Sequence, residues 1–463
     1  MSRSRVLVIA ATAVMAAAAA LFAALQPATS AGVQERQSRW WKPPSDVRSM
    51  LRDVSSRSLE RYDRGLVRFG TRHTLSTQDD PNRGIGAARD WIKAEFDKIA
   101  ATSGGRMTVE LDSYIQQPVP RVPAPTRITN VVATLRGTDA SSVDRVYVVG
   151  AHYDSRVSDV LNATSDAPGA NDDASGTSAV LELARVFASH PTEATIVFVA
   201  FAGEEQGLFG SDHFAQVAQD NGWNIQGVLN MDIIGSPIGG NGFREPRTVR
   251  VLNEGVPTAE TPQQTARRQS LGGENDGVSR QLARYVKETG ENGATGMEVR
   301  LVYRRDRFGR GGDQISFLER GWPAVRYSEP NENFDHQHQD VRVENGRQFG
   351  DLIEFVDFRY LQRVTRTIGS SLAALARSPR APRNVRIPTA LSYDTQVSWT
   401  ANPESDVVGY EIVWRDSTAP LWTHSRRVGN VTTAVIENLN KDNYQVGVRA
   451  IDRDGNRSPV ATP

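Results

Sequence analysis

The sequence contains no cysteine among its 463 residues. This absence excludes disulfide bonds, a lipid-modified cysteine and any metal site built on thiolates, so a bound metal would need nitrogen and oxygen ligands. The chain also lacks a net charge, because 54 Lys and Arg residues balance 54 Asp and Glu residues. Nothing in that balance favours nucleic acid or an anionic membrane surface as a partner.

The N-terminus departs from this neutral average. Arg3 and Arg5 precede an alanine-rich apolar run at residues 6–25, and small residues follow up to Ala31. A basic start, an apolar centre and small residues in this order are typical of a secretory signal peptide. We therefore expect a signal peptide at residues 1–31 and a secreted protein, extracellular or periplasmic, with no stable membrane association. An uncleaved anchor is the alternative, because the run is near spanning length.

Buried strands and amphipathic helices alternate along the next three hundred or so residues, and the segment at 236–270 is expected to form surface loops. This alternation predicts an α/β fold, a mostly parallel mixed sheet with helices on both faces. The runs expected as strands are nearly continuously apolar, as in strands buried on both faces, and lie at 130–135, 146–150, 195–201 and 227–232. The runs with helical periodicity lie at 47–66, 87–99, 175–188, 278–289 and 349–375.

The pattern changes to alternating polar and apolar residues after Pro379 and Pro382, which mark a linker. Such alternation is typical of half-buried antiparallel strands. The early Trp399, the run Gly409-Tyr410-Glu411-Ile412 and Tyr444 resemble a fibronectin type III module, which implies an all-β sandwich. This module contains no recognisable catalytic or metal site, so we expect it to be a spacer or to bind a surface or polymer. We also expect the protein to be a monomer. The expected organisation is a signal peptide at 1–31, an α/β domain at 32–378 with an arm at 32–46, and a β-sandwich at 379–463.

Side chains suited to metal binding follow the predicted strands. His152 and Asp154 end the strand that begins at Val146; the imidazole can bind a metal while the carboxylate holds its other ring nitrogen. Asn171, Asp172 and Asp173 stand before the helix at 175–188. Helix capping needs only one such side chain, whereas a carboxylate with two oxygens can bridge two metal ions.

The strongest local signal is Glu204-Glu205, directly after the most apolar strand. Adjacent carboxylates there repel each other and lose solvation, which a purely structural role does not explain. In a metal site one would be a ligand and the other a base. Asp232 supplies a carboxylate after the next strand, and the loop at 332–340 contains His336 and His338.

In combination, the order His, Asp, Glu-Glu, Asp, His resembles peptidase family M28, the co-catalytic zinc exopeptidases, over residues 60–375. The resemblance implies the zinc exopeptidase fold and two zinc ions per chain. It implies that His152 and Asp232 bind one zinc, that Glu205 and His336 bind the other, and that Asp172 bridges the two ions. It further implies that Glu204 is the general base and that Asp154 orients His152. His336 is preferred over His338 because Asp340 follows it at the family's H-x-x-x-D spacing; the choice between the two stays open.

The resemblance further implies an aminopeptidase that acts on peptide substrates. Three alternatives stay open: a carboxypeptidase, whose substrate carboxylate could bind the basic loop at 304–310; a glutaminyl-cyclase-like acyltransferase; and a binding protein with an inactive peptidase fold. Two positions depart from the family. Asp335 stands where many relatives have a tyrosine that stabilises the oxyanion, and Gly312-Asp313-Gln314 stands where relatives often read Ser/Gly-Asp-His. We expect these departures to alter pocket detail rather than metal binding.

Overall fold

The structure is a computed structural model that describes residues 41–463. The expected signal peptide at 1–31, and the expected arm up to residue 40, lie outside the described residues. Among the helices of residues 41–463, none is both long and apolar enough to span a bilayer.

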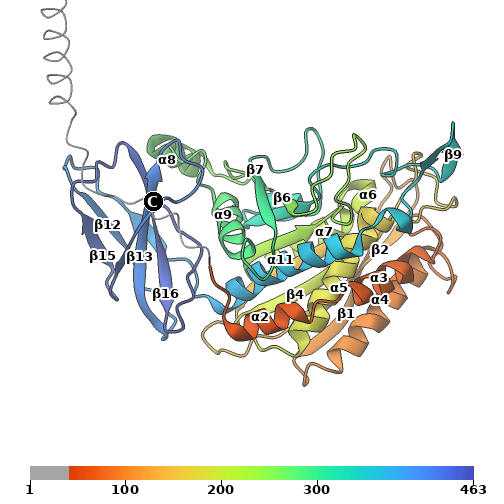
Figure 1. Ribbon diagram of the computed structural model, residues 1–463, viewed down its shortest axis with the longest axis horizontal. Coiled ribbons are helices and arrows are strands. Elements are labelled where there is room, and N and C mark those ends of the chain that lie inside the picture. Colours follow the sequence, from red (N-terminus) through yellow and green to blue (C-terminus); the bar gives the residue numbers. More distant parts are fainter. Residues whose placement is uncertain (1–40) are drawn as a thin grey trace, which may run out of the picture. The chain divides into compact units, whose positions relative to one another are not determined.

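An eight-stranded mixed sheet lies at the centre of the α/β domain (Figure 1), in the order β1-β2-β4-β3-β5-β8-β6-β7. The four middle strands, β4, β3, β5 and β8, are parallel to one another, and so are β6 and β7. The pairs β1–β2, β2–β4 and β6–β8 are antiparallel. The strands are Met107–Gln116 (β1), Thr126–Leu135 (β2), Arg145–His152 (β3), Thr195–Phe201 (β4), Asn224–Met231 (β5), Thr248–Leu252 (β6), Glu298–Val302 (β7) and Ala324–Ser328 (β8).

Helices cover both faces of this sheet, because alternate side chains of a buried strand enter different cores. In β3, Tyr147 and Val149 belong to the core formed with α2, α3, α4, α5, α9 and α11. Val148, between them, belongs to a second core formed with α7 and α10. The expected mixed sheet with helices on both faces is confirmed. The helices are Ser45–Arg52 (α2), Ser56–Val67 (α3), Gly84–Ala100 (α4), Ser175–Ala188 (α5), Glu204–Gly207 (α6), Phe209–Asp220 (α7), Pro262–Leu271 (α8), Val278–Gly290 (α9), Gln314–Leu318 (α10) and Phe358–Arg377 (α11).

The single helix expected over 47–66 is wrong, because the chain breaks between α2 and α3. Ser55 caps α3 by accepting a hydrogen bond from the Ser58 amide at 3.3 Å. Its own amide donates to Glu182 Oε1 at 2.6 Å. A side-chain cap satisfies an amide that would otherwise lack a partner at the start of a helix, so Ser55 favours a new helix over continuation of α2.

Two other boundaries also differ from expectation. The region 236–270 is not all loop: it contains β6 and the start of α8, where Thr261 and Gln264 form a reciprocal capping box. The last helix, expected from residue 349, begins at Phe358, because Asp357 caps it through the amides of Arg359 at 2.9 Å and Tyr360 at 3.0 Å. A strand at Arg347–Phe349 (β10), paired with Arg342–Glu344 (β9), and a short helix at Ile353–Phe355 (η2) precede it.

The C-terminal residues form two three-stranded antiparallel sheets, β11-β12-β15 and β14-β13-β16. Their shared core contains Trp399 and Tyr410, whose ring centroids are 5.1 Å apart. The expected all-β sandwich is confirmed. Its strands are Arg383–Arg386 (β11), Thr395–Thr400 (β12), Val407–Asp416 (β13), His424–Val428 (β14), Thr433–Ile436 (β15) and Tyr444–Asp452 (β16).

Candidate metal centre

The polar residues after three neighbouring strands meet at one edge of the sheet. His152 is the last residue of β3, Glu204 follows β4 and Asp232 follows β5. Because β4, β3 and β5 are parallel neighbours, their carboxyl ends lie side by side. Ligands of open α/β sheets bind at this edge, so the fold itself assembles the candidate site.

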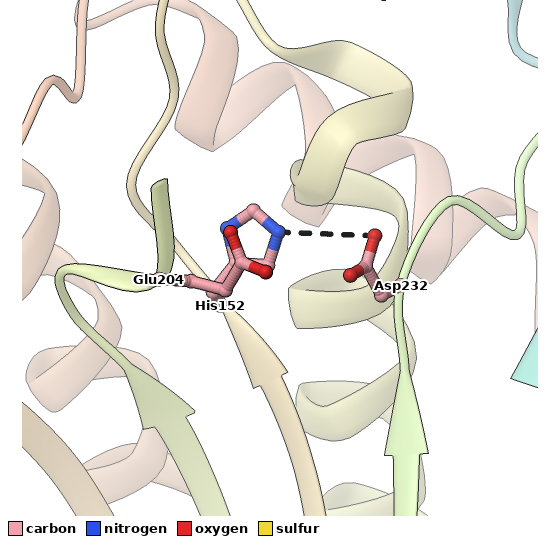
Figure 2. A group of neighbouring side chains, drawn as sticks. All are labelled: His152, Glu204 and Asp232. Carbon is pink, nitrogen blue, oxygen red and sulfur yellow. Dashed lines mark ion pairs between the residues drawn. The ribbon is translucent and has the colours of Figure 1, made fainter. Parts of the chain in front are cut away.

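The first cluster consists of His152, Glu204 and Asp232, whose nearest ligand-type atoms lie within 4.8 Å of one another (Figure 2). His152 Nε2 lies 3.9 Å from Asp232 Oδ1 and 3.2 Å from Asp172 Oδ1. The imidazole is 1% exposed. A nitrogen surrounded by buried carboxylate oxygens is a suitable environment for a divalent cation.

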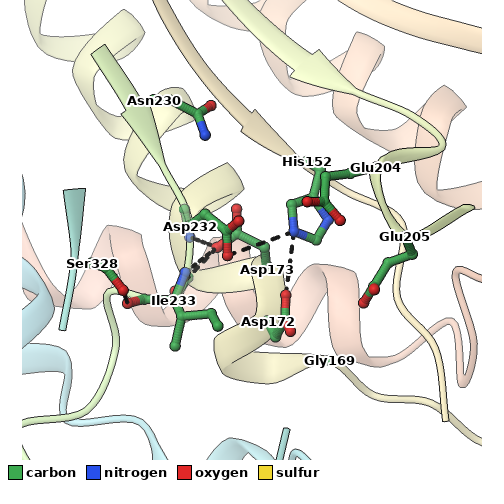
Figure 3. A network of polar contacts seen from close by, with 12 residues as sticks. His152, Gly169, Asp172, Asp173, Glu204, Glu205, Asn230, Asp232, Ile233 and Ser328 are labelled. Carbon is green, nitrogen blue, oxygen red and sulfur yellow. Dashed lines mark hydrogen bonds and ion pairs between the residues drawn. The ribbon is translucent and has the colours of Figure 1, made fainter. Parts of the chain in front are cut away.

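The second cluster consists of Asp172, Glu205 and His338, again within 4.8 Å. His338 Nε2 lies 2.9 Å from Asp172 Oδ2 and 3.1 Å from Glu205 Oε2. Asp172 therefore directs one carboxylate oxygen to each histidine, as Figure 3 shows for its side near His152. This arrangement would allow Asp172 to bridge two metal ions.

The structure brings His338, and not the preferred His336, to this cluster. The His336 ring instead stacks on Phe355, with centroids 3.6 Å apart. The amides of His336 and Gln337 donate to the Asn333 carbonyl in a tight turn, and His338 adopts a left-handed backbone with φ 55°. This turn, rather than the spacing to Asp340, decides which imidazole faces Asp172. Asp340 accepts a hydrogen bond from Ser158.

Apart from the distances between these side chains, their hydrogen bonding also indicates that they could bind a metal ion. His152 Nε2 and Glu205 Oε1 are buried, and within residues 41–463 neither makes a hydrogen bond. A buried polar atom without a partner costs about 1–3 kcal/mol. His152 Nε2 faces the carboxylates of Asp172 and Asp232, so a metal ion would supply its missing partner.

Asp154 lies behind the first cluster, next to the His152 ring. Its backbone oxygen is 3.1 Å from His152 Nδ1 and its Oδ1 is 3.5 Å from the same nitrogen. The carboxylate also accepts hydrogen bonds from Thr74 Oγ1 at 2.8 Å and from the amides of Glu204 and Glu205. Burial opposes its ionisation, but the contacts with His152 and Thr74 outweigh burial and lower the pKa of Asp154. It thus fixes both the imidazole and the start of the Glu204-Glu205 turn.

Glu204 and Glu205 separate into the two clusters. Burial is the largest cause that raises the pKa of Glu204 well above its usual value, and the charges of Asp232 and Glu205 add to it. The Glu205 carboxylate contacts His338 and also receives Arg156 Nε at 2.9 Å. Burial therefore increases the affinity of Glu204 for a proton.

The neighbouring Asp173 points away from the second cluster. It accepts hydrogen bonds from the amides of Gly176 at 3.0 Å and Ile233 at 3.2 Å. These contacts hold the start of α5 to the chain after β5. Asp172, in contrast, donates its amide to Asp351 Oδ2 at 2.7 Å, which leaves its carboxylate directed at the histidines. The structure thus directs the Asp172 carboxylate, and not that of Asp173, between the two histidines.

Several charged residues that contact the clusters were not found from the sequence. Arg326 Nη2 lies 2.8 Å from Asp232 Oδ1, and Arg326 is 0% exposed on β8. Arg156 contacts Glu205, and its Nη2 lies 2.6 Å from His338 Nδ1. An arginine inside a buried strand such as β8 is the one sequence signal that could have drawn attention, because buried arginines need a charged partner.

Asp313, in the segment that departs from the family pattern, is also fully buried. Neither of its carboxylate oxygens hydrogen-bonds within the described chain. Burial raises its pKa to about 7. Its charge also contributes to the raised pKa of Glu204. The departure at 312–314 therefore lies close enough to the site to influence its electrostatics.

An α/β sheet with paired carboxylate and histidine clusters at its carboxyl edge fits a metal-dependent hydrolase. The family model described as peptidase family M28 matches residues 130–345, and that of the fibronectin type III domain matches residues 380–463. A probable zinc metalloprotease of Pyrenophora teres f. teres is 50% identical over 426 residues, covering 91% of this chain and 88% of the relative. A probable zinc metalloprotease of Pyricularia oryzae is 50% identical over 428 residues, covering 91% and 85%.

This chain belongs to peptidase family M28, and it is a zinc metalloprotease. Two solved structures share its fold. The LapA aminopeptidase of Legionella pneumophila matches with a TM-score of 0.50 and 19% identity, over 73% of this chain and 78% of that chain. An aminopeptidase from Aneurinibacillus sp. strain AM-1 matches with a TM-score of 0.50 and 15% identity, over 72% and 96%. The family and the fold class expected from the sequence are confirmed.

Proposed function

We propose that this protein is a secreted aminopeptidase that uses two zinc ions to remove N-terminal residues from peptides. The observation that carries the proposal is the position of Asp172. Its Oδ1 lies 3.2 Å from His152 Nε2, and its Oδ2 lies 2.9 Å from His338 Nε2. One carboxylate shared by two clusters supports a pair of metal ions rather than a single one.

Each zinc would have nitrogen and oxygen ligands from this chain. His152, Asp172 and Asp232 would hold one ion, and Asp172, Glu205 and His338 would hold the other. When bound, the zinc ions supply Lewis acidity, which polarises the scissile carbonyl and makes water a better nucleophile. Three protein ligands per ion leave a coordination position open, as catalytic zinc sites require.

Glu204 would act as the general base. It would accept a proton from the attacking water and pass it to the leaving amine. Its raised pKa, caused chiefly by burial, increases its affinity for that proton. Asp154 would keep His152 in one orientation through the contacts at Nδ1, so that Nε2 stays directed into the first cluster.

The basic loop at 304–310 supports an aminopeptidase over a carboxypeptidase, because two of its arginines are already paired. Arg307 contacts Asp306 at 3.0 Å and Glu332 at 3.3 Å. Arg310 contacts the same Glu332 at 2.6 Å. Arg307, whose side chain is 9% exposed, would have to leave buried carboxylates before it could bind a substrate carboxylate, which costs several kcal/mol.

Export is proposed on the sequence of residues 1–31 alone. The basic start, the alanine-rich run and the small residues at its end support recognition and cleavage by a signal peptidase. The mass of the mature protein recovered outside the cell tests this part of the proposal, since cleavage after Ser30 or Ala31 gives two defined masses. Retention of the full-length chain in the membrane would contradict it.

Three matched peptides test the reaction: one with both ends free, one N-acetylated and one C-amidated. An aminopeptidase cleaves the free and the amidated peptides, releases the first residue and loses activity on chelation. Cleavage of the free and acetylated peptides from the other end would establish a carboxypeptidase. Cyclisation of an N-terminal glutamine without hydrolysis would establish an acyltransferase. Zinc analysis of the same preparation, with two ions per chain expected, tests the metal count separately.

A further inference from the structure

The C-terminal β-sandwich contacts the α/β domain through buried charges on α9 and just before it. Asp276 accepts from Arg284 Nη1 at 2.7 Å within its own domain. It also accepts from Arg415 Nη2 of β13 at 2.7 Å, and the Arg415 side chain is 1% exposed. Removing one member of a buried ion pair leaves an uncompensated charge, so these contacts hold the two domains in one arrangement.

Further polar contacts extend the same interface along α9. Arg449 of β16 contacts Glu288 at 2.8 Å. Tyr285 donates its hydroxyl to the Arg457 carbonyl at 2.9 Å, and Trp422 donates its indole N–H to Gln281 at 3.1 Å. Each turn of α9 thus contacts a residue of the β-sandwich. A domain joined only by a flexible linker would not make such contacts, because its surface would face solvent.

One contact of this interface reaches the segment after β7. Tyr303, the first residue after that strand, donates its hydroxyl to the Pro420 carbonyl of the β-sandwich at 3.0 Å. Arg284 Nε donates to the same carbonyl at 2.8 Å. The Arg280 guanidinium lies 3.5 Å from the centre of the Tyr303 ring. Tyr303 is therefore held between α9 and the C-terminal domain.

The residues after Tyr303 lead directly to the metal centre. Asp306 accepts from Arg326 Nη1 at 3.2 Å, and Arg326 Nη2 lies 2.8 Å from Asp232 Oδ1. Arg307 Nη2 lies 3.9 Å from Asp232 Oδ2. One oxygen of Asp232 thus faces Arg326, which contacts Asp306 of this segment, and the other faces Arg307 within the segment.

We propose that the C-terminal domain positions the active-site segment 304–312, and that Tyr303 is the positioning residue that transmits this support to Asp232. The C-terminal domain then contributes to the geometry of the active site and is not only a spacer. The inference rests on the proposed function for the metal role of Asp232; the mechanical link from Pro420 to residues 304–312 does not depend on it.

The test is hydrogen–deuterium exchange of the zinc-loaded full-length protein carrying Tyr303→Phe. This substitution keeps the ring beside Arg280 and removes only the hydrogen bond to Pro420. Exchange of the amides at 304–312 should rise about fivefold, the factor that loss of one hydrogen bond gives. Tyr393→Phe is the matched control, because Tyr393 lies in the C-terminal domain, away from this interface, and is 91% exposed. It should change neither exchange nor zinc retention.

Zinc retention against a competing chelator gives the second measurement. Tyr303→Phe should speed the release of one zinc per chain about three- to tenfold and raise KM more than it lowers kcat, with a thermal midpoint equal to that of the control. A lower thermal midpoint with unchanged local exchange would mean a purely structural role and would overturn the proposal. Unchanged exchange at 304–312 would overturn it as well. Because exchange needs no substrate, failure of the aminopeptidase assignment would leave this result interpretable.

Discussion

Replacement of His338 by alanine should remove one zinc ion and leave the other. Among residues 41–463, His338 is the only nitrogen ligand in the second cluster, so the variant would retain two carboxylates, Asp172 and Glu205. Arg156, at 2.9 Å from Glu205, would then compete with a metal for that carboxylate. The first cluster keeps His152 and Asp232 and should still bind its ion.

The expected loss of zinc affinity can be estimated by comparison with milder substitutions. Loss of a residue that only supports a ligand costs roughly 10–100-fold in metal affinity, so loss of the ligand itself should cost at least about 100-fold. That factor corresponds to about 2.8 kcal/mol, since each tenfold is about 1.4 kcal/mol. The assay is zinc content after dialysis against a zinc buffer: wild type should hold two ions and His338→Ala one, with kcat reduced at least about 100-fold.

His336→Ala is the matched control, two residues away in the same loop. It removes the ring stacked on Phe355 at 3.6 Å, and such a pair contributes about 0.5–1.5 kcal/mol to stability. Its zinc content should stay at two ions per chain. If His336→Ala loses a zinc while His338→Ala retains both, the assignment of the second cluster is refuted and the H-x-x-x-D spacing is the better guide.

Three other changes probe separate parts of the molecule. Glu204→Gln should keep both zinc ions but lower kcat by about 100- to 10,000-fold, the usual contribution of a general base; full activity would exclude Glu204 as that base. Arg415→Ala should destabilise the protein by about 3 kcal/mol in urea unfolding, the lower end for a broken buried ion pair, because Asp276 keeps a second arginine. Burial raises the pKa of Glu193 to about 7, so the folded state binds this proton more tightly than the unfolded state. Stability should therefore fall as pH rises from about 4.5 to 7; Glu193→Gln should reduce this fall by about 1–2 kcal/mol, allowing for partial solvent screening, whereas exposed Glu437→Gln should not.

The features predicted well from the sequence are those determined by neighbouring residues. The apolar run at 195–201 became β4 with the same bounds, and the periodic run at 175–188 became α5. His152, Glu204 and Asp232 come together because each lies at or just after the end of one of three adjacent parallel strands. For these three residues, the predicted strands were sufficient to predict that the side chains lie close together.

The features that were missed depend on loops and on contacts between distant residues. Two histidines in one loop offer the same chemistry, and only the turn at Asn333 and the left-handed backbone of His338 decide which of them faces Asp172. The break at Ser55 likewise depends on Glu182, which lies 127 residues further along the chain. Periodicity describes a segment's own preference, whereas these outcomes depend on partners supplied by the rest of the fold.

The arginines around Asp232 show how such distant partners affect chemistry. A carboxylate that also contacts Arg326 donates less charge to a metal than one held by neutral groups. Glu205 has a similar partner in Arg156, whereas Asp172 accepts from Gln337 Nε2 at 3.1 Å and faces a histidine on each side. Asp172, the proposed bridge, is thus the carboxylate whose charge is least compensated by arginine. Of the three it should contribute most to holding a metal pair together, and Asp172→Asn should release both zinc ions, whereas Asp232→Asn or Glu205→Gln should release one.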